Sequence, residues 1–124
     1  MSELSAGKGN SMTPNDTQSP IEIDPSSVKQ MLERGEVLLF VDVREHWEHE
    51  VSRVEGSTLI PLREIPANVA RFRDASEIVL FCHHGRRSLN AAVWLRSQGI
   101  GNARSMTGGI DRWSVEVDPQ VPRY

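Results

Sequence analysis

This chain of 124 residues contains only one cysteine, Cys82. A single thiol can form no disulfide within the chain, and a Cys-x-x-Cys redox pair is excluded. Any covalent chemistry at Cys82 must therefore be completed on another molecule.

Long apolar segments and an excess of positive charge are missing as well. No apolar run approaches the ~20 residues that a membrane-spanning helix needs, and no apolar core of a secretory signal is visible. We therefore expect a cytoplasmic protein that does not bind membranes. The 14 basic and 17 acidic residues give a formal net charge of −3. This balance argues against a protein that binds nucleic acid by neutralising phosphates.

The chain length suits one folded domain. Residues 1–20 are rich in Ser, Gly, Asn, Thr and Pro and contain no aromatic side chain. Such a segment cannot bury enough apolar surface to offset the entropy of ordering it. We predict a disordered tail over residues 1–20 and a folded domain over residues 21–124.

Short apolar runs and amphipathic segments alternate along the predicted domain. The run at 37–41 is apolar on both faces, as a central parallel strand should be. Further strands are predicted at 58–60, 78–81 and 103–107. Helices are predicted from Asp24 to Gly35, over 65–72, over 88–98, and after Gly108-Gly109. This alternation predicts an α/β domain built on a parallel sheet.

The only cysteine comes directly after the predicted strand 78–81. Ligands of open α/β sheets bind at the carboxyl ends of strands. Here the turn 82–88 can curl so that its N–H groups point inward, and Gly85 permits the tight curl. The following helix N-terminus, Arg86 and Arg87 add positive charge. We therefore expect Cys82 to be a thiolate nucleophile that attracts anions.

Two other interpretations of Cys82 are open at this point. A lone cysteine is often a small buried hydrophobe, although the polar and Gly neighbours here disfavour a core position. A zinc site could instead draw on Cys82, His83, His84 and the pair His46 and His49. Adjacent histidines do not provide the two spaced pairs that are typical of structural zinc. We expect neither a metal nor an organic cofactor.

Several sequence motifs outside the cysteine loop accompany it. The loop "CHHGRRS" is followed by an Ala-rich helix and, near the end, by "GGIDRW"; "VDVRE" and "EGSTLIPL" lie upstream. This combination resembles the rhodanese-like sulfurtransferases over residues 21–124. The resemblance implies a five-stranded parallel sheet with helices on both faces, and transfer of a sulfane sulfur through a cysteine persulfide.

The same resemblance assigns roles to individual residues. Cys82 matches the persulfide-forming nucleophile of a six-membered loop that ends at Arg87. The predicted substrate-binding residues around it are His83, His84, Gly85, Arg86, Arg87 and Ser88. Asp42 and Arg44 match a "DxR" pattern, for which a structural or loop-supporting role is expected. The closing motif supplies Gly108, Gly109 and Trp113, which we interpret as packing residues.

The sequence departs from the family pattern upstream of the loop. Ser52-Arg53-Val54 stands where Gly-His-Ile is common, and Leu59 stands where Asn is frequent, which affects the local turn and the rim of the pocket. The ending "VDPQVPRY" resembles the tail of rhodanese domains fused to adenylyltransferases that charge ubiquitin-like sulfur carriers. We interpret it as a surface strap over the sheet.

By resemblance, the donor is thiosulfate or a similar compound, and the acceptor is cyanide, a small thiol or a protein. The chain is expected to be a monomer. One alternative is a non-catalytic binding or regulatory module of the same fold, whose usual sign is loss of the loop cysteine. Another is a phosphatase of the same fold. Such phosphatases place Arg six positions after the cysteine, where this chain has Ser88.

Overall fold

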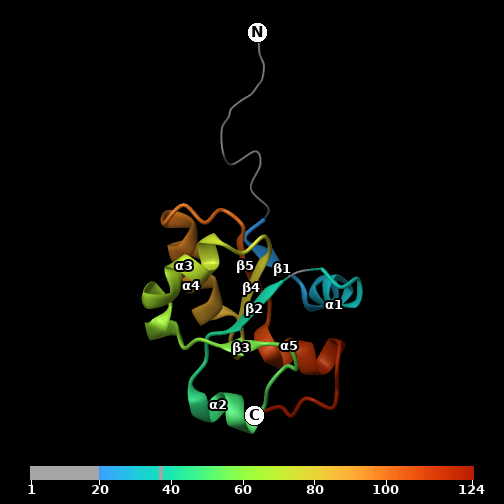
Figure 1. Ribbon diagram of the computed structural model, residues 1–124. Coiled ribbons are helices and arrows are strands. Elements are labelled where there is room, and N and C mark those ends of the chain that lie inside the picture. Colours follow the sequence, from blue (N-terminus) through green and yellow to red (C-terminus); the bar gives the residue numbers. More distant parts are fainter. Residues whose placement is uncertain (1–19, 37) are drawn as a thin grey trace.

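The computed structural model describes residues 20–36 and 38–124. Of the predicted tail, only the exposed Pro20 belongs to this part; residues 1–19 lie outside it. Within the described ranges, no helix is long and apolar enough to cross a membrane. The structure confirms the predicted α/β class (Figure 1).

A five-stranded sheet forms the centre of the protein, with the strand order β1-β5-β4-β2-β3. Every pair of neighbouring strands is parallel. The strands are β1 (Glu22–Ile23), β2 (Leu39–Asp42), β3 (Thr58–Leu59), β4 (Ile78–Phe81) and β5 (Ala103–Met106). The five-stranded parallel sheet implied by the family resemblance is therefore confirmed.

Helices cover both faces of this sheet, with α3 and α4 on one side and α1 and α5 on the other (Figure 1). The helices are α1 (Pro25–Glu33), α2 (His46–Val51), α3 (Val69–Arg73), α4 (Arg86–Ser97) and α5 (Gly109–Glu116). Two 3₁₀ turns, η2 (Leu62–Glu64) and η3 (Pro66–Asn68), precede α3.

Strand β4 shows why the central strands are apolar throughout. Ile78 and Leu80 pack into the core beneath α3 and α4, with Leu95. Val79 and Phe81 point the other way, into the core beneath α1 and α5. Because both faces of the sheet are covered, each residue of the strand is buried.

The local pattern does not predict every element. The two-residue strand β1 is too short to show periodicity. Helix α2 has little apolar content and is held instead by a capping box between Glu45 and Glu48. The single helix predicted at 65–72 is wrong, because the segment is divided into η3 and α3 at Asn68, whose backbone leaves helical geometry with φ −110° and ψ 15°.

Burial differs sharply along α4, and this difference predicts stability. Leu95 is fully buried, whereas Val93 on the same helix is 53% exposed. We expect Leu95→Ala to lower the free energy of unfolding by about 3 kcal/mol, because it leaves a cavity beneath the helix. Val93→Ala is the matched control and should change it by less than about 0.5 kcal/mol. Urea unfolding followed by tryptophan fluorescence measures both; equal losses would contradict this assignment of the helix faces.

Candidate active site

Cys82 lies at the carboxyl edge of the sheet, between the end of β4 and the start of α4. Helix α4 begins at Arg86, two residues earlier than the sequence pattern predicts, so Arg86 and Arg87 belong to its first turn. Gly85 precedes it in the left-handed conformation, with φ 107°. This glycine lets the chain reverse within three residues of Cys82.

The loop directs hydrogen-bond donors at the cysteine sulfur. Sγ of Cys82 accepts hydrogen bonds from the backbone N–H of Gly85 at 3.1 Å and of Ser88 at 3.4 Å. The Ser88 hydroxyl lies 3.5 Å from the same sulfur. Cys82 itself is only 1% exposed. Donors converging in this way form a site that can stabilise negative charge at the centre of the loop.

A residue outside the predicted site supports this arrangement. The hydroxyls of Ser88 and Ser105 are 2.8 Å apart, and both side chains are buried. Ser105 lies in β5, so a neighbouring strand orients the hydroxyl that contacts the sulfur. Sequence reasoning missed this residue. The only signal for it in the sequence is that a small polar residue stands inside the predicted strand 103–107.

Helix α5 holds the loop from the opposite side. The N–H groups of Ile110 and Asp111 donate to the carbonyls of Cys82 and His83, at 2.8 and 3.1 Å. Any side chain on Gly109 would collide with the same two carbonyls. Gly109 therefore permits a close approach of α5 to the cysteine loop, which is a more specific role than the predicted packing. Trp113 is a packing residue in the core on that side.

Asp42 and Arg44 form a fully buried ion pair at the end of β2. The Arg44 guanidinium donates to both carboxylate oxygens of Asp42, at 2.8 and 2.7 Å. It also donates to the carbonyl of Ser52 at 2.5 Å and to the hydroxyl of Tyr124 at 2.8 Å. Burial acts to lower the pKa of Arg44, but the hydrogen bonds to Asp42 and Tyr124 outweigh it and raise the pKa. Arg44 therefore stays charged, and neither residue contacts the sulfur directly.

Arg87 is bound by a buried carboxylate on α2. Its guanidinium makes a bidentate contact with Glu48, at 2.8 and 3.0 Å. Burial acts to raise the pKa of Glu48, but hydrogen bonds from Arg87, from the Glu45 N–H and from Tyr124 lower it to about 2. Glu48 was not predicted as a site residue, because the chain contains eleven glutamates and the local sequence does not distinguish this one from the others. Its role depends on a contact across 39 positions.

His83 lies within a stack of three aromatic rings. Its ring centroid is 3.9 Å from those of both His84 and Tyr124. Burial lowers the pKa of His83, and the neighbouring His84 lowers it further. His83 is therefore mainly neutral at pH 7, and the positive charge of the loop comes from its arginines. Arg86 is exposed and has no hydrogen-bond or ion-pair partner in the part of the chain that the structure describes.

The zinc ligands considered from the sequence do not come together. Among residues 20–36 and 38–124, the one cluster of three metal-ligating side chains is His83, His84 and Asp111, without Cys82. The Asp111 carboxylate is already bound by Arg123, at 2.9 and 3.2 Å. Since a metal binds in the plane of an imidazole, two stacked rings do not direct both nitrogens at one ion. These residues do not fit a resident metal.

The segment 117–124, here called the strap, passes from α5 to α2 (Figure 1). Ser114 donates its hydroxyl to the carbonyl of Val121, and Ser52 donates to that of Pro122, both at 2.6 Å. Ser52 is one of the departures from the family pattern, and here it anchors the strap. The predicted strap is present, but it ends at the active-site edge instead of running over the sheet.

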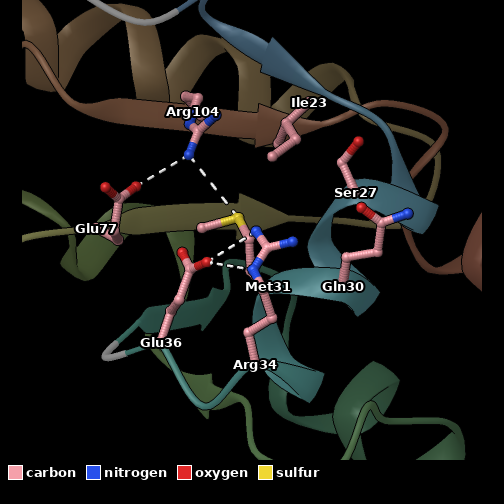
Figure 2. Close-up of a pocket in the computed structure, with 8 residues that line it drawn as sticks. All are labelled: Ile23, Ser27, Gln30, Met31, Arg34, Glu36, Glu77 and Arg104. Atoms are coloured by element: carbon pink, nitrogen blue, oxygen red, sulfur yellow. Dashed lines mark hydrogen bonds and ion pairs between the residues drawn. The ribbon is translucent and has the colours of Figure 1, made fainter.

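A separate cavity of about 350 Å³ opens beside α1 (Figure 2). Its charged side chains pair with one another: Arg34 with Glu36, and Arg104 with Glu77. None of the residues of the cysteine loop lines it. This cavity is therefore distinct from the candidate active site.

Comparison with known proteins identifies the family. Residues 24–116 match the Rhodanese-like domain, and the chain belongs to this family. A sulfurtransferase of Allochromatium vinosum is 31% identical over 100 residues, covering 81% of this chain and 94% of that protein. The human single-domain sulfurtransferase TSTD1 has a similar structure, with a TM-score of 0.70 and 23% identity over 79% of this chain and 98% of TSTD1.

Other relatives are much longer than this chain. The chloroplastic Rhodanese-like/PpiC domain-containing protein 12 of Arabidopsis thaliana is 35% identical over 88 residues, which are 68% of this chain but 29% of that protein. The chain likewise spans 21% of the adenylyltransferase and sulfurtransferase MOCS3-2 of Zea mays. Membership of the family therefore does not by itself define a donor, an acceptor or a partner.

Glu48 makes stability depend on pH. Its pKa is about 2 in the folded protein, against an ordinary value of 4.5. The stabilisation is therefore present above pH 4.5 and is lost as the pH falls toward 2. We expect Glu48→Gln to lower the free energy of unfolding by about 3 kcal/mol at neutral pH, and the difference from wild type to shrink as the pH falls through this range.

The matched control for this prediction is Glu50→Gln, at an exposed position on the same helix. It should change the free energy of unfolding by less than about 0.5 kcal/mol. Urea unfolding at a series of pH values measures both variants. A Glu48→Gln effect that is constant from neutral to acidic pH would contradict the buried ion pair.

Proposed function

We propose that this protein is a sulfurtransferase that moves a sulfane sulfur from thiosulfate or a similar donor to a thiophilic acceptor through a persulfide on Cys82. The observation that carries the proposal is the convergence of the Gly85 and Ser88 N–H groups on the cysteine sulfur. The Allochromatium vinosum relative, which matches over nearly its whole length, is named a sulfurtransferase. This similarity supports the same general activity here.

In the loading step, the Cys82 thiolate attacks the outer sulfur of thiosulfate. A new S–S bond forms while the S–S bond of thiosulfate breaks, and sulfite leaves with the electron pair of that bond. Three negative charges enter the step and three leave it, as persulfide anion and sulfite dianion. The loop N–H groups and the positive end of α4 stabilise the charge that develops on the sulfur atoms.

In the discharge step, a thiophilic acceptor removes the terminal sulfur. Cyanide attacks it to give thiocyanate, and the bonding pair returns to Cys82 as thiolate. A small thiol or a protein thiolate would take the sulfur in the same way. Both steps conserve atoms and electrons, so the cycle needs no further oxidant or reductant.

The two arginines of the loop have different roles in this proposal. Arg87 is neutralised by its bidentate contact with Glu48, so its charge is largely balanced within the protein. Arg86 is exposed and unpaired among the described residues, so it is the side chain that attracts an anionic donor. The sequence pattern does not separate these two roles.

The alternative functions have less support. A phosphatase of this fold would need a cation six positions after the cysteine, but Ser88 occupies that position and contacts Ser105. A binding module would not require donors directed at the sulfur. The acceptor class, the monomeric state and the cytoplasmic location are predictions made from the sequence alone.

Sulfur loading is the direct test of the proposal. We expect incubation with thiosulfate to add the mass of one sulfur atom to the intact protein, as measured by mass spectrometry under non-reducing conditions. Excess cyanide should restore the original mass and release thiocyanate. Cys82→Ser, with an unchanged circular dichroism spectrum, should do neither. Failure to load from thiosulfate, from a persulfide and from a cysteine desulfurase would favour the binding-module alternative.

Arg86 provides a separate test of donor recognition. We expect Arg86→Ala to lower kcat/KM for thiosulfate about two- to fivefold, because an exposed charge contributes a modest attraction. The loss should become smaller at high salt, since screening weakens the wild-type attraction. Lys29→Ala, on the exposed side of α1, is the control and should have no effect. Equal kinetics for Arg86→Ala and wild type at low salt would show that Arg86 does not recognise the donor.

A further inference from the structure

Tyr124 is the residue of the strap that reaches the active-site loop. Its hydroxyl accepts a hydrogen bond from Arg44 and donates one to Glu48, each at 2.8 Å. Its ring stacks on His83 with an angle of 7° between the ring planes. Trp47 of α2 packs edge-on against the same ring, with the centroids 6.1 Å apart. One side chain therefore contacts the segment after β2, helix α2 and the cysteine loop.

The hydroxyl completes the set of donors around Glu48. One carboxylate oxygen accepts from Arg87 and from the Glu45 N–H. The other accepts from Arg87 and from Tyr124. Burial raises the pKa of Tyr124 to about 12, against the opposing effect of Arg44, so the hydroxyl keeps its proton at neutral pH. The Tyr124 hydroxyl thus holds Glu48 in the orientation in which it binds Arg87.

Arg87 transmits this orientation to the cysteine. It lies in the first turn of α4, next to Ser88, whose N–H and hydroxyl both face the sulfur. Arg87 is also close enough to Cys82 for a negative sulfur to contribute to the raised pKa of the guanidinium. A shift of Glu48 would therefore move positive charge relative to the sulfur.

The ring acts on the other end of the loop. His83 directly follows Cys82, and its ring lies between those of Tyr124 and His84. The charged or titratable side chains around it are His84, Asp111, Glu48 and Tyr124. His83 Nε2 is buried and has no hydrogen-bond partner among residues 20–36 and 38–124. Removing the Tyr124 ring would therefore expose this imidazole to water.

We propose that Tyr124 is a positioning residue of the sulfur-transfer site, which fixes the loop at His83 through its ring and at Arg87 through its hydroxyl and Glu48. The proposal deepens the proposed function and rests on it, because the loop that Tyr124 fixes is the one that receives the sulfur donor. Tyr124 does not touch the sulfur and acts only through these neighbours.

Tyr124→Phe tests the hydroxyl and retains the ring. We expect kcat/KM for loading from thiosulfate to fall about tenfold, as for the loss of a hydrogen bond to a charged group. Discharge of a preformed persulfide by cyanide should change less than twofold, because cyanide does not depend on the arginines to the same extent. Hydrogen exchange of the Arg87 side-chain N–H, followed by NMR, should become faster. Gln120→Ala, at an exposed strap position, is the matched control.

Tyr124→Leu removes both the ring and the hydroxyl. The pKa of His83, measured by NMR titration, should rise toward its ordinary value of 6.5 in this variant, because the imidazole becomes more exposed. In Tyr124→Phe the pKa of His83 should keep its wild-type value. This difference separates the action of the ring from that of the hydroxyl.

Two results would overturn the proposal. The first is that Tyr124→Phe has the same loading kinetics and the same Arg87 hydrogen-exchange rate as Gln120→Ala. The second is an equal fall in loading and discharge that follows the loss of folded protein, which would show a purely structural role. If wild type takes sulfur from no donor, the proposed function fails, whereas the Arg87 exchange and the His83 titration still decide whether Tyr124 positions the loop.

Discussion

The buried guanidinium of Arg44 is the constraint on which the active-site edge depends. A charge with no solvent exposure is costly unless hydrogen bonds satisfy it. Arg44 obtains its partners from β2, from the segment after α2 and from the strap, through Asp42, Ser52 and Tyr124. These three segments must therefore come together at one place, although 80 positions separate Arg44 from Tyr124.

The cysteine loop depends on a second set of constraints from its own side of the sheet. Strand β4 delivers Cys82 to the edge, α4 supplies the Ser88 donors, and α5 binds the loop carbonyls through its first N–H groups. Gly109 allows α5 to come this close, because a side chain there would meet the loop backbone. A rigid set of donors around the sulfur needs no reorganisation when charge develops on it, which is the property that favours catalysis.

The two sets of constraints, those around Arg44 and those around the cysteine loop, meet at the contact between Glu48 and Arg87. Glu48 belongs to α2, which the sequence pattern did not predict. Arg87 belongs to the cysteine loop, which the sequence pattern did predict. Their contact balances one of the two loop arginines and leaves Arg86 available. Thus the charge that a donor meets is set by a contact between distant segments and not by the composition of the loop.

Strong local patterns determined much of the fold. The apolar runs of β2 and β4 and the helical spacing of α1 and α4 are visible in the sequence, because burial of both sheet faces imposes them. The position of Cys82 after a buried strand likewise predicted a site at the sheet edge. By contrast, β1 and α2 have no periodic signal of their own. The segment 65–72 has helical spacing but is divided into η3 and α3 at Asn68, where the backbone leaves helical geometry.

The sequence by itself determined the class of fold, the position of Cys82 at the end of a strand and the loop around it, because these depend on residues that are neighbours along the chain. Only the tertiary structure decided which side chains surround that loop. Ser105, Glu48 and Tyr124 reach it from three separate elements. No local pattern distinguishes Ser105 and Glu48 from the other Ser and Glu residues, or shows where the only tyrosine of the chain packs. Their roles follow from long-range packing, in which each buried polar group must find a partner.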